Sequence, residues 1–347
     1  MRKFTCPNCA GQLYFENFAC TRCGSNVEFN PLPQDFECLD PDAPSLACNN
    51  RESGVCNWRK DWSSDSFCRA CKLNHTIPRL DADGNLELWK RLEFAKRRVL
   101  YDFGRLGLTA PERGGDGEIG LAFDFLSPAD GKVVTGHDSG LITINLAEAD
   151  DAHREQIRTE LGEPYRTLIG HFRHECGHYL FDRFVAGTNE LEPFRATFGD
   201  ESRDYAQALK DYYAHPPEWR EHFVSAYASS HPWEDWAESC AHYLHIVSTL
   251  DTFFASTLSG DGAAVPVHDP YRERDFDVVI RQWFPLAELL NELNRSMGLH
   301  DPYPFVLTPT AIDKLRLVQQ ILHRASRASA NAQAPARKDE AEFAASP

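Results

Sequence analysis

Long apolar runs and an excess of positive charge are both missing from this sequence. No apolar stretch approaches the ~20 residues that a membrane-spanning helix needs, so we expect a chain that does not enter a membrane. The 347 residues include 36 Lys and Arg against 52 Asp and Glu, which gives a net charge of −16. Because phosphate contacts need a basic face, this balance disfavours nucleic acid as a partner.

Cysteine is scarce over most of the chain, because only Cys176 and Cys240 follow residue 71. The other nine of the 11 cysteines lie within the first 71 residues and mark a separate N-terminal module. The opening residues, MRKFTCPNCAG, contain no apolar stretch of the kind that a secretory signal needs. We therefore expect a cytoplasmic protein, in which cysteines serve as metal ligands or catalysts more often than as disulfides.

Residue composition divides the chain into three parts. Residues 1–80 form the cysteine-rich module and residues 81–325 a second domain. Residues 326–347 are rich in Ala, Ser, Glu and Lys, and we expect them to be a disordered tail.

Helical patterns outnumber strand patterns in the second domain. Two apolar, β-branched stretches, 119–126 and 140–146, predict a pair of antiparallel strands. The fold class that we predict is α+β, mostly helical with a small antiparallel sheet. Apolar periodicity, with proline at several joins, predicts helices over residues 86–103, 153–161, 165–185, 204–214, 222–228, 233–250, 275–297 and 310–325.

Two CxxC pairs at the start of the chain have the spacing of a zinc site. Ten residues separate the pair Cys6 and Cys9 from the pair Cys20 and Cys23. Each pair presents two thiolates from one tight turn, and two such pairs form a tetrahedral site of four sulfurs that suits Zn²⁺. A redox dithiol would stand beside a βαβ pattern, which this region lacks.

Four further cysteines, Cys48, Cys56, Cys68 and Cys71, predict a second structural zinc site, although only the last two form a CxxC pair. Partial disulfide pairing or a cluster without metal is the alternative. Cys38 is then a spare thiol or a replacement for Cys48. Both sites would fold a short segment that has little apolar core, and the module would offer a surface to a protein partner.

His174, Glu175 and His178 form an HExxH motif within a helical pattern of apolar residues. Histidines at positions i and i+4 lie one turn apart on one helix face, so both imidazoles can bind one Zn²⁺. Glu175 would take a proton from a water molecule on that zinc.

A hydrolytic zinc site needs a third protein ligand, and the helix predicted at 233–250 offers Glu234, Glu238, His242 and His245. We predict Glu238, because it lies between the small residues Ala237 and Ala241, which permit close packing of the two helices. His242, one turn later, is the alternative ligand or an outer partner of the site. The competing interpretation is that this helix only packs in the core.

Two residues just before this helix, Tyr227 and His231, are the nearest candidates to donate a hydrogen bond to the oxyanion of a transition state, and a structural role is the alternative for each. Zinc peptidases commonly bind an extended substrate along an edge strand. The stretch 140–146, upstream of the HExxH motif, is a candidate for that strand, and an ordinary strand of the sheet is the alternative.

Seven motifs spread over nearly the whole chain resemble those of bacterial zinc-binding metallopeptidases that carry an N-terminal zinc ribbon. The resemblance implies a gluzincin-like domain after the ribbon, in which a Glu of the WAE segment corresponds to Glu238. It does not specify a substrate. The motifs are CPNC with CTRC (6–9, 20–23), CNW (56–58), CRACKLNHTIP (68–78), HECGHYLFDRF (174–184), SAYASSHPWEDWAESCAHYLHI (225–246), LNRSMG (293–298) and DPYPFVL (301–307).

The function that these patterns predict is a zinc-dependent metallopeptidase with one catalytic and two structural Zn²⁺ ions and a peptide or protein substrate. A catalytically silent scaffold that binds a partner through its ribbon is the main alternative, and the intact Glu175 disfavours it. A protease acting on proteins crosslinked to DNA is disfavoured by the acidic charge. The same chemistry would also hydrolyse a non-protein amide.

Overall fold

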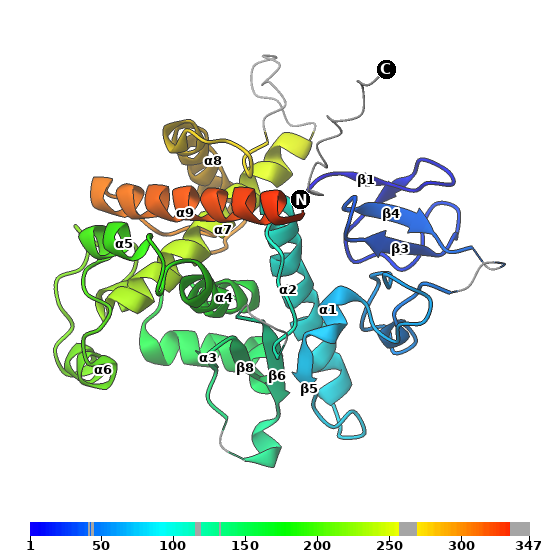
Figure 1. Ribbon diagram of the computed structural model, residues 1–347, viewed down its shortest axis with the longest axis horizontal. Coiled ribbons are helices and arrows are strands. Elements are labelled where there is room, and N and C mark those ends of the chain that lie inside the picture. The colour runs from blue at the N-terminus through cyan, green and yellow to red at the C-terminus, as the bar shows by residue number, and fades with distance from the viewer. Residues whose placement is uncertain (41, 43–44, 115–118, 132, 257–268, 334–347) are drawn as a thin grey trace, which may run out of the picture.

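The computed structural model describes residues 1–40, 42, 45–114, 119–131, 133–256 and 269–333 (Figure 1). The N-terminal module is a ribbon of two antiparallel hairpins. Its core is aromatic, with the rings of Phe4, Phe15 and Phe29 in mutual contact. The strands are β1 (Phe4–Thr5), β2 (Gln12–Leu13), β3 (Val27–Asn30) and β4 (Asp35–Cys38), and the short helix α1 (Arg69–Lys72) follows them.

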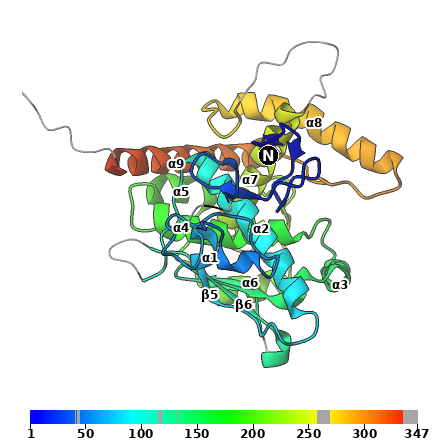
Figure 2. The same cartoon turned by 90° about the vertical axis from the view of Figure 1, so that its right-hand side faces the viewer.

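The ribbon packs against the long helix α2 (Asn85–Leu106), which lies between it and the other helices in Figure 1. Figure 2 turns the side of the ribbon toward the viewer. Tyr101 of α2 is fully buried in the aromatic core of the ribbon, 5.4 Å from the ring of Phe15. The side chain of Gln34 donates to the carbonyl of Tyr101 at 3.1 Å, and Arg98 pairs with Glu16. The ribbon and the helical domain therefore share α2 as a common core element.

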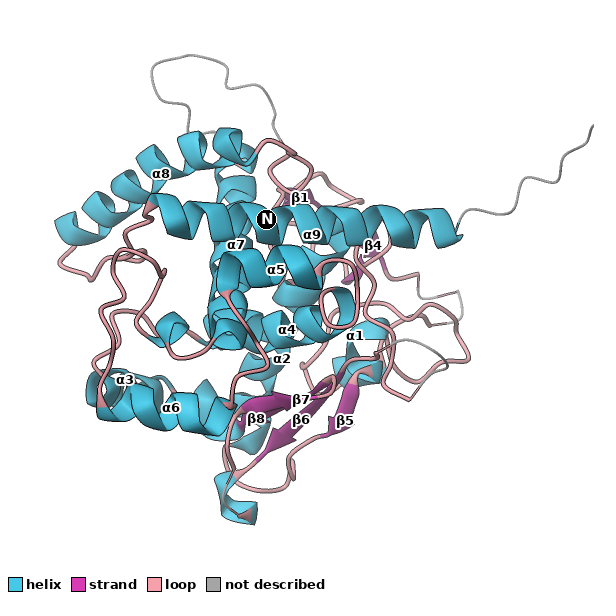
Figure 3. Cartoon of the chain, turned by 60° about the vertical axis from the view of Figure 1, so that its left-hand side comes forward, coloured by secondary structure: helices cyan, strands magenta, loops and turns pink. Residues whose placement is uncertain are grey.

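A four-stranded sheet lies against one side of helix α4 (Leu168–Phe184), and Phe172 of that helix contacts Phe123 and Phe125 (Figure 3). The order is β5-β6-β8-β7, and β7 is antiparallel to β8 while the other neighbours are parallel. The strands are β5 (Asn74–Thr76), β6 (Ala122–Leu126), β7 (Gly136–Asp138) and β8 (Leu141–Asn145).

The predicted antiparallel pairing of 119–126 with 140–146 is wrong, because β6 and β8 run parallel. The short polar strand β7 lies between them in sequence and forms the hairpin with β8. Its residues, Gly-His-Asp, carry no apolar alternation that would reveal a strand. At the hairpin turn Gly140 has φ of +84°, and a Cβ atom there would lie 2.0 Å from the carbonyl oxygen of Gly120.

Helices make up most of the second domain, as predicted, and none of the described helices is long and apolar enough to cross a membrane. The helix predicted at 222–228 is wrong, because only a 3₁₀ turn at Tyr227–Ser229 forms there, and α5 was not predicted. The remaining helices are α3 (Asp151–Leu161), α5 (Leu191–Phe198), α6 (Tyr205–Ala214), α7 (Pro232–Ala255), α8 (Phe276–Ser296) and α9 (Pro309–Gln333).

The predicted disordered tail begins too early, because α9 continues through residue 326 to Gln333. Alanine, which is abundant in this stretch, is the strongest helix former, and this preference extends the helix beyond its apolar pattern. Residues 334–347, the rest of that predicted tail, lie outside the described residues.

We expect Tyr101→Ala to lower the free energy of unfolding by about 3–5 kcal/mol, the usual cost of removing a buried aromatic ring. The ring fills the core of the ribbon from the helix of the other domain, so both units lose packing. Urea denaturation of the zinc-loaded chain measures the change. Tyr14→Ala is the control, because Tyr14 is 62% exposed, and equal effects of the two substitutions would contradict a shared core.

Candidate metal centre and active site

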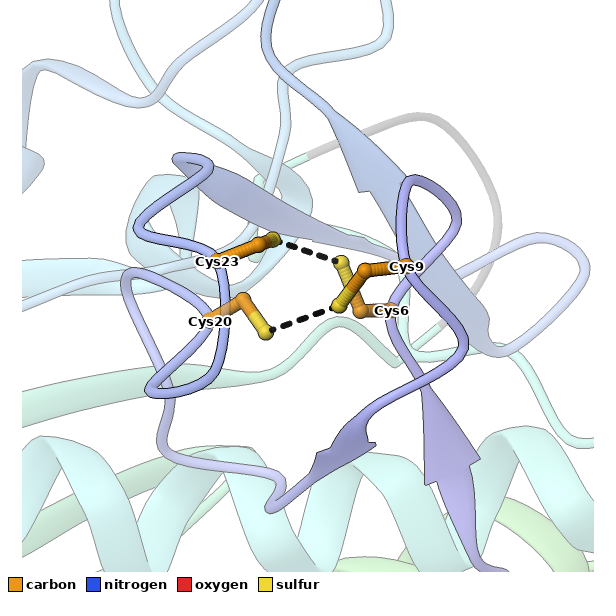
Figure 4. A group of neighbouring side chains, drawn as sticks. All are labelled: Cys6, Cys9, Cys20 and Cys23. Carbon is orange, nitrogen blue, oxygen red and sulfur yellow. Dashed lines mark hydrogen bonds between the residues drawn. The ribbon is translucent and has the colours of Figure 1, made fainter.

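The first four predicted cysteine ligands lie together at the tips of the ribbon (Figure 4). The sulfurs of Cys6 and Cys23 are 3.7 Å apart, and those of Cys9 and Cys20 are also 3.7 Å apart. A tetrahedral zinc with Zn–S bonds of about 2.3 Å places its sulfurs about 3.8 Å from one another. The cluster therefore fits Zn²⁺.

The second cluster joins Cys48, Cys56, Cys68 and Cys71, all four of which are buried. The sulfurs of Cys56 and Cys68 are 3.5 Å apart, and the amide of Cys68 donates to the sulfur of Cys48 at 3.5 Å. Cys38 lies on β4 in neither cluster, so Cys48 is the fourth member of this one. All 11 cysteines are free, which removes the disulfide alternative.

Helices α4 and α7 cross in close contact at the third candidate site. A Cβ atom on Gly177 would lie 2.8 Å from Cα of Ala237, so only glycine permits this approach. The indole of Trp236 donates to the carbonyl of Gly177 at 2.9 Å, which fixes the register of the two helices. The crossing sets the histidines of α4 directly against the carboxylates of α7.

His174, His178 and Glu234 are brought together at this crossing. The Oε2 atom of Glu234 lies 3.0 Å from Nε2 of His174 and 3.3 Å from Nε2 of His178. Glu234 is 1% exposed, yet its Oε2 atom has no hydrogen-bond partner among the described residues. Zinc binds imidazole nitrogens and carboxylate oxygens. This group offers two such nitrogens and one buried oxygen that lacks a hydrogen bond, so these residues fit the metal.

Glu238 occupies a different position from the one that we predicted for it. Its Oε1 atom lies 2.8 Å from Nδ1 of His174, on the side of the ring away from Nε2, and Ser225 donates to its Oε2 atom at 2.6 Å. The structure thus places Glu234 among the metal-facing atoms and Glu238 behind His174. The two glutamates are one helical turn apart on the same face, and the sequence pattern does not show which turn faces the histidines.

His242 and His245 lie further along α7, away from this group. The Nδ1 atom of His242 is 2.9 Å from the hydroxyl of Tyr303, and Nδ1 of His245 is 3.4 Å from the hydroxyl of Tyr165. The alternative of His242 as the third ligand therefore finds no support in the geometry, because its ring is not among the three side chains whose donor atoms converge.

Glu175 lines a cavity beside the histidines and is 8% exposed. Burial raises the pKa of its carboxyl to about 7, and the charges of Glu234 and Glu148 add to this effect, while His174 opposes it. A carboxyl group with a pKa near neutrality is suited to accept and return a proton at that pH.

The two predicted hydrogen-bond donors differ in their surroundings. Tyr227 lines the same cavity, with its ring 5.9 Å from that of His174. His231 is the N-cap of α7: Nδ1 accepts from the amide of Trp233 at 3.1 Å, and Nε2 lies 3.2 Å from the carbonyl of Arg203. The predicted role of His231 as a donor to the transition state does not agree with this geometry, because both ring nitrogens are already engaged.

Tyr205, the first residue of α6, is a site residue that sequence reasoning missed. Its hydroxyl donates to Oε1 of Glu234 at 2.6 Å, which leaves Oε2 turned toward the histidines. On the other side, the indole of Trp233 covers the ring of His178 with centroids 3.7 Å apart. No pattern in a single sequence distinguishes a tyrosine on a surface helix for this role.

Comparison with known proteins assigns the same two units. A family described as "Putative zinc-binding metallo-peptidase" matches residues 85–321, and one described as "zinc-ribbon domain" matches residues 3–82. Uncharacterised proteins of Mycobacterium tuberculosis and Mycobacterium bovis are each 43% identical to this chain over 328 residues, which cover 93% of it and 95% of the relative. No solved structure matches the chain.

We expect elemental analysis to find about three zinc ions per chain, one for each candidate site. Glu234→Ala should remove about one of them, because it deletes the carboxylate that faces both Nε2 atoms. Glu238→Ala removes only an outer partner and should weaken zinc binding by about 10- to 100-fold without abolishing it. Zinc titration measures both effects.

The matched control is Glu221→Ala, because Glu221 is exposed and lies outside the site. The reverse order, with zinc lost from the Glu238 variant and kept in the Glu234 variant, would restore the original ligand prediction.

Proposed function

Because the chain belongs to this family of zinc-binding metallo-peptidases, we propose that it hydrolyses peptide bonds with a water molecule activated at the α4–α7 crossing. The convergence of His174, His178 and Glu234 on one point, with Glu175 beside it, is the observation that carries the proposal. We further propose one catalytic zinc at this point and a structural zinc in each cysteine cluster.

Zinc held by His174, His178 and Glu234 would polarise the substrate carbonyl and lower the pKa of a bound water molecule. Glu175 takes the proton from the attacking water and returns it to the leaving amine. Glu238 accepts from Nδ1 of His174, which holds the ring with Nε2 toward the metal position.

Tyr227 is the donor that we propose for the oxyanion, because its ring lines the cavity next to His174. Tyr205 holds the other oxygen of Glu234 and so orients the proposed ligand. Both hydroxyls remain protonated at neutral pH, because burial raises the pKa of each phenol.

We propose that the substrate backbone pairs with β7, which is the last strand of the sheet. His137 of β7 has its ring 6.0 Å from that of His178, so a peptide along this strand would pass the metal position. The stretch 140–146, which we predicted for this role, is β8, and β8 is paired with β6 on one side and with β7 on the other.

The role of the ribbon in recognising a protein partner or substrate also remains a proposal. Tyr14 and Leu32 are 62% and 66% exposed on the ribbon, and a partner would cover such apolar groups. The ribbon is joined to α2 through Tyr101, so it is also a structural support of the helical domain.

We expect Glu175→Gln to lower peptide cleavage by about 10²- to 10⁴-fold, the usual contribution of a general base. Zinc content should stay unchanged, because Glu175 is not one of the three converging residues. A peptide library incubated with the zinc-loaded chain and analysed by mass spectrometry detects cleavage.

Glu221→Gln, at an exposed position, is the matched control and should cleave like the unaltered chain. Equal cleavage by the Glu175 variant would refute the proposed base. Failure of the zinc-loaded chain to cleave any member of the library would favour the silent scaffold.

A further inference from the structure

A cavity of about 410 Å³ opens beside His174 and Glu175 of the candidate site and extends away from them between α4 and α7. On α4 its wall runs from His174 back to His171 and Thr167, and on α7 it runs from Glu238 to Ala241 and His245. Seven residues of helix span about 10 Å. The cavity is therefore deep enough for a large side chain that extends from a substrate held at the metal.

Aromatic rings from distant parts of the chain close the far end of this cavity. Phe305 lies 4.4 Å from His242, 5.1 Å from Tyr303 and 5.7 Å from Tyr165, measured between ring centroids. His245 adds a fifth ring, 5.3 Å from Tyr303. All five rings line the cavity, and aromatic rings pack favourably edge to face or offset against one another. Another aromatic ring is therefore a favourable occupant.

His242 offers a polar atom to an occupant of this aromatic end. Nδ1 of His242 is engaged with the hydroxyl of Tyr303, whereas Nε2 has no hydrogen-bond partner among the described residues, and the ring lines the cavity. Burial lowers the pKa of His242 to about 4, so the imidazole is neutral at pH 7. It can therefore exchange a hydrogen bond with a neutral polar edge.

The five rings at the aromatic end, Tyr165, His242, His245, Tyr303 and Phe305, include no carboxylate and no cationic group. Arg173 is paired with Asp102 at 2.9 Å in the core, and Arg166 is paired with Glu163 at 3.0 Å and with Glu148 at 3.2 Å. A carboxylate or an ammonium group that entered this end would therefore have no counter-charge among the five rings. Burying a charge without a partner is costly.

We infer that this cavity is a subsite for a large, neutral aromatic side chain next to the scissile bond, with tyrosine as the best fit. The inference rests on the proposed peptidase function and goes beyond it by naming the substrate class. The five rings select an aromatic occupant, the lack of a counter-charge among them disfavours Lys, Arg, Asp and Glu, and His242 bonds the phenol hydroxyl.

Amino-acid hydroxamates test the subsite by binding alone, because the hydroxamate group chelates zinc while the side chain enters the cavity. The probes are acetohydroxamate and the hydroxamates of tyrosine, lysine and glutamate, titrated calorimetrically into the zinc-loaded full chain. We expect the tyrosine compound to bind at least about ten-fold more tightly than the two charged compounds, as burial of an aromatic ring predicts.

Ala241→Phe fills the cavity from its α7 wall and should remove this preference while acetohydroxamate binds as before. Ala255→Phe, at the end of the same helix and outside the cavity, is the matched control and should keep the preference. Phe305→Ala, which opens the aromatic end, gives an independent variant and should reduce the preference.

Each outcome separates the subsite from the metal centre. Binding of acetohydroxamate with equal or better binding of the charged compounds overturns the subsite and leaves the proposed function in place. A preference that survives Ala241→Phe also overturns it. If acetohydroxamate itself fails to bind the zinc-loaded chain, the proposed catalytic metal is refuted and the subsite falls with it.

Discussion

At the crossing of α4 and α7, the backbone of Gly177 lies against Ala237, and this contact determines where every proposed ligand lies. Any side chain at Gly177 would push the helices apart, since a Cβ atom there already meets Cα of Ala237 at 2.8 Å. The distance between the two helices decides whether Glu234 reaches both histidines. Its Oε2 atom lies 3.0 Å from Nε2 of His174 and 3.3 Å from Nε2 of His178, so a small shift of either helix would break this arrangement. Gly177, inside the HExxH motif, is thus as important for the geometry of the site as the two histidines at its ends.

Helix α2 connects the ribbon to this crossing through two consecutive residues. Tyr101 fills the core of the ribbon, and Asp102 pairs in the buried interior with Arg173, the residue before His174. The hydroxyl of Tyr271 also donates to Asp102, at 2.5 Å, and so secures the carboxylate. Because adjacent residues on a helix point about 100° apart, one turn of α2 contacts both units. Zinc in the ribbon therefore helps to hold α4 in position.

Local spacing predicted the parts of the site that lie within one helix or one turn. The histidines of the motif and the two cysteine clusters lie where their spacing placed them. The choice between Glu234 and Glu238 depends on how far α7 slides along α4, which is a property of tertiary packing. Likewise Tyr205 and Phe305 reach the site from separate elements through chain connections that no local pattern encodes.

Charge balance links the ligands to the proposed base. Glu175, Glu234 and Glu238 are gathered in a largely buried site, and the ion pairs of Glu234 and Glu238 among the described residues are with histidines only. Burial opposes the charged form of His174, but hydrogen bonds to Glu234 and Glu238 raise its pKa, whereas burial lowers the pKa of His178. One imidazolium does not balance this group of carboxylates, so a divalent cation there would stabilise the arrangement. The same cation would favour the charged form of Glu175, whose pKa burial raises to about 7. Since only the charged form accepts a proton, the ion that balances the ligands also keeps the base ready to act.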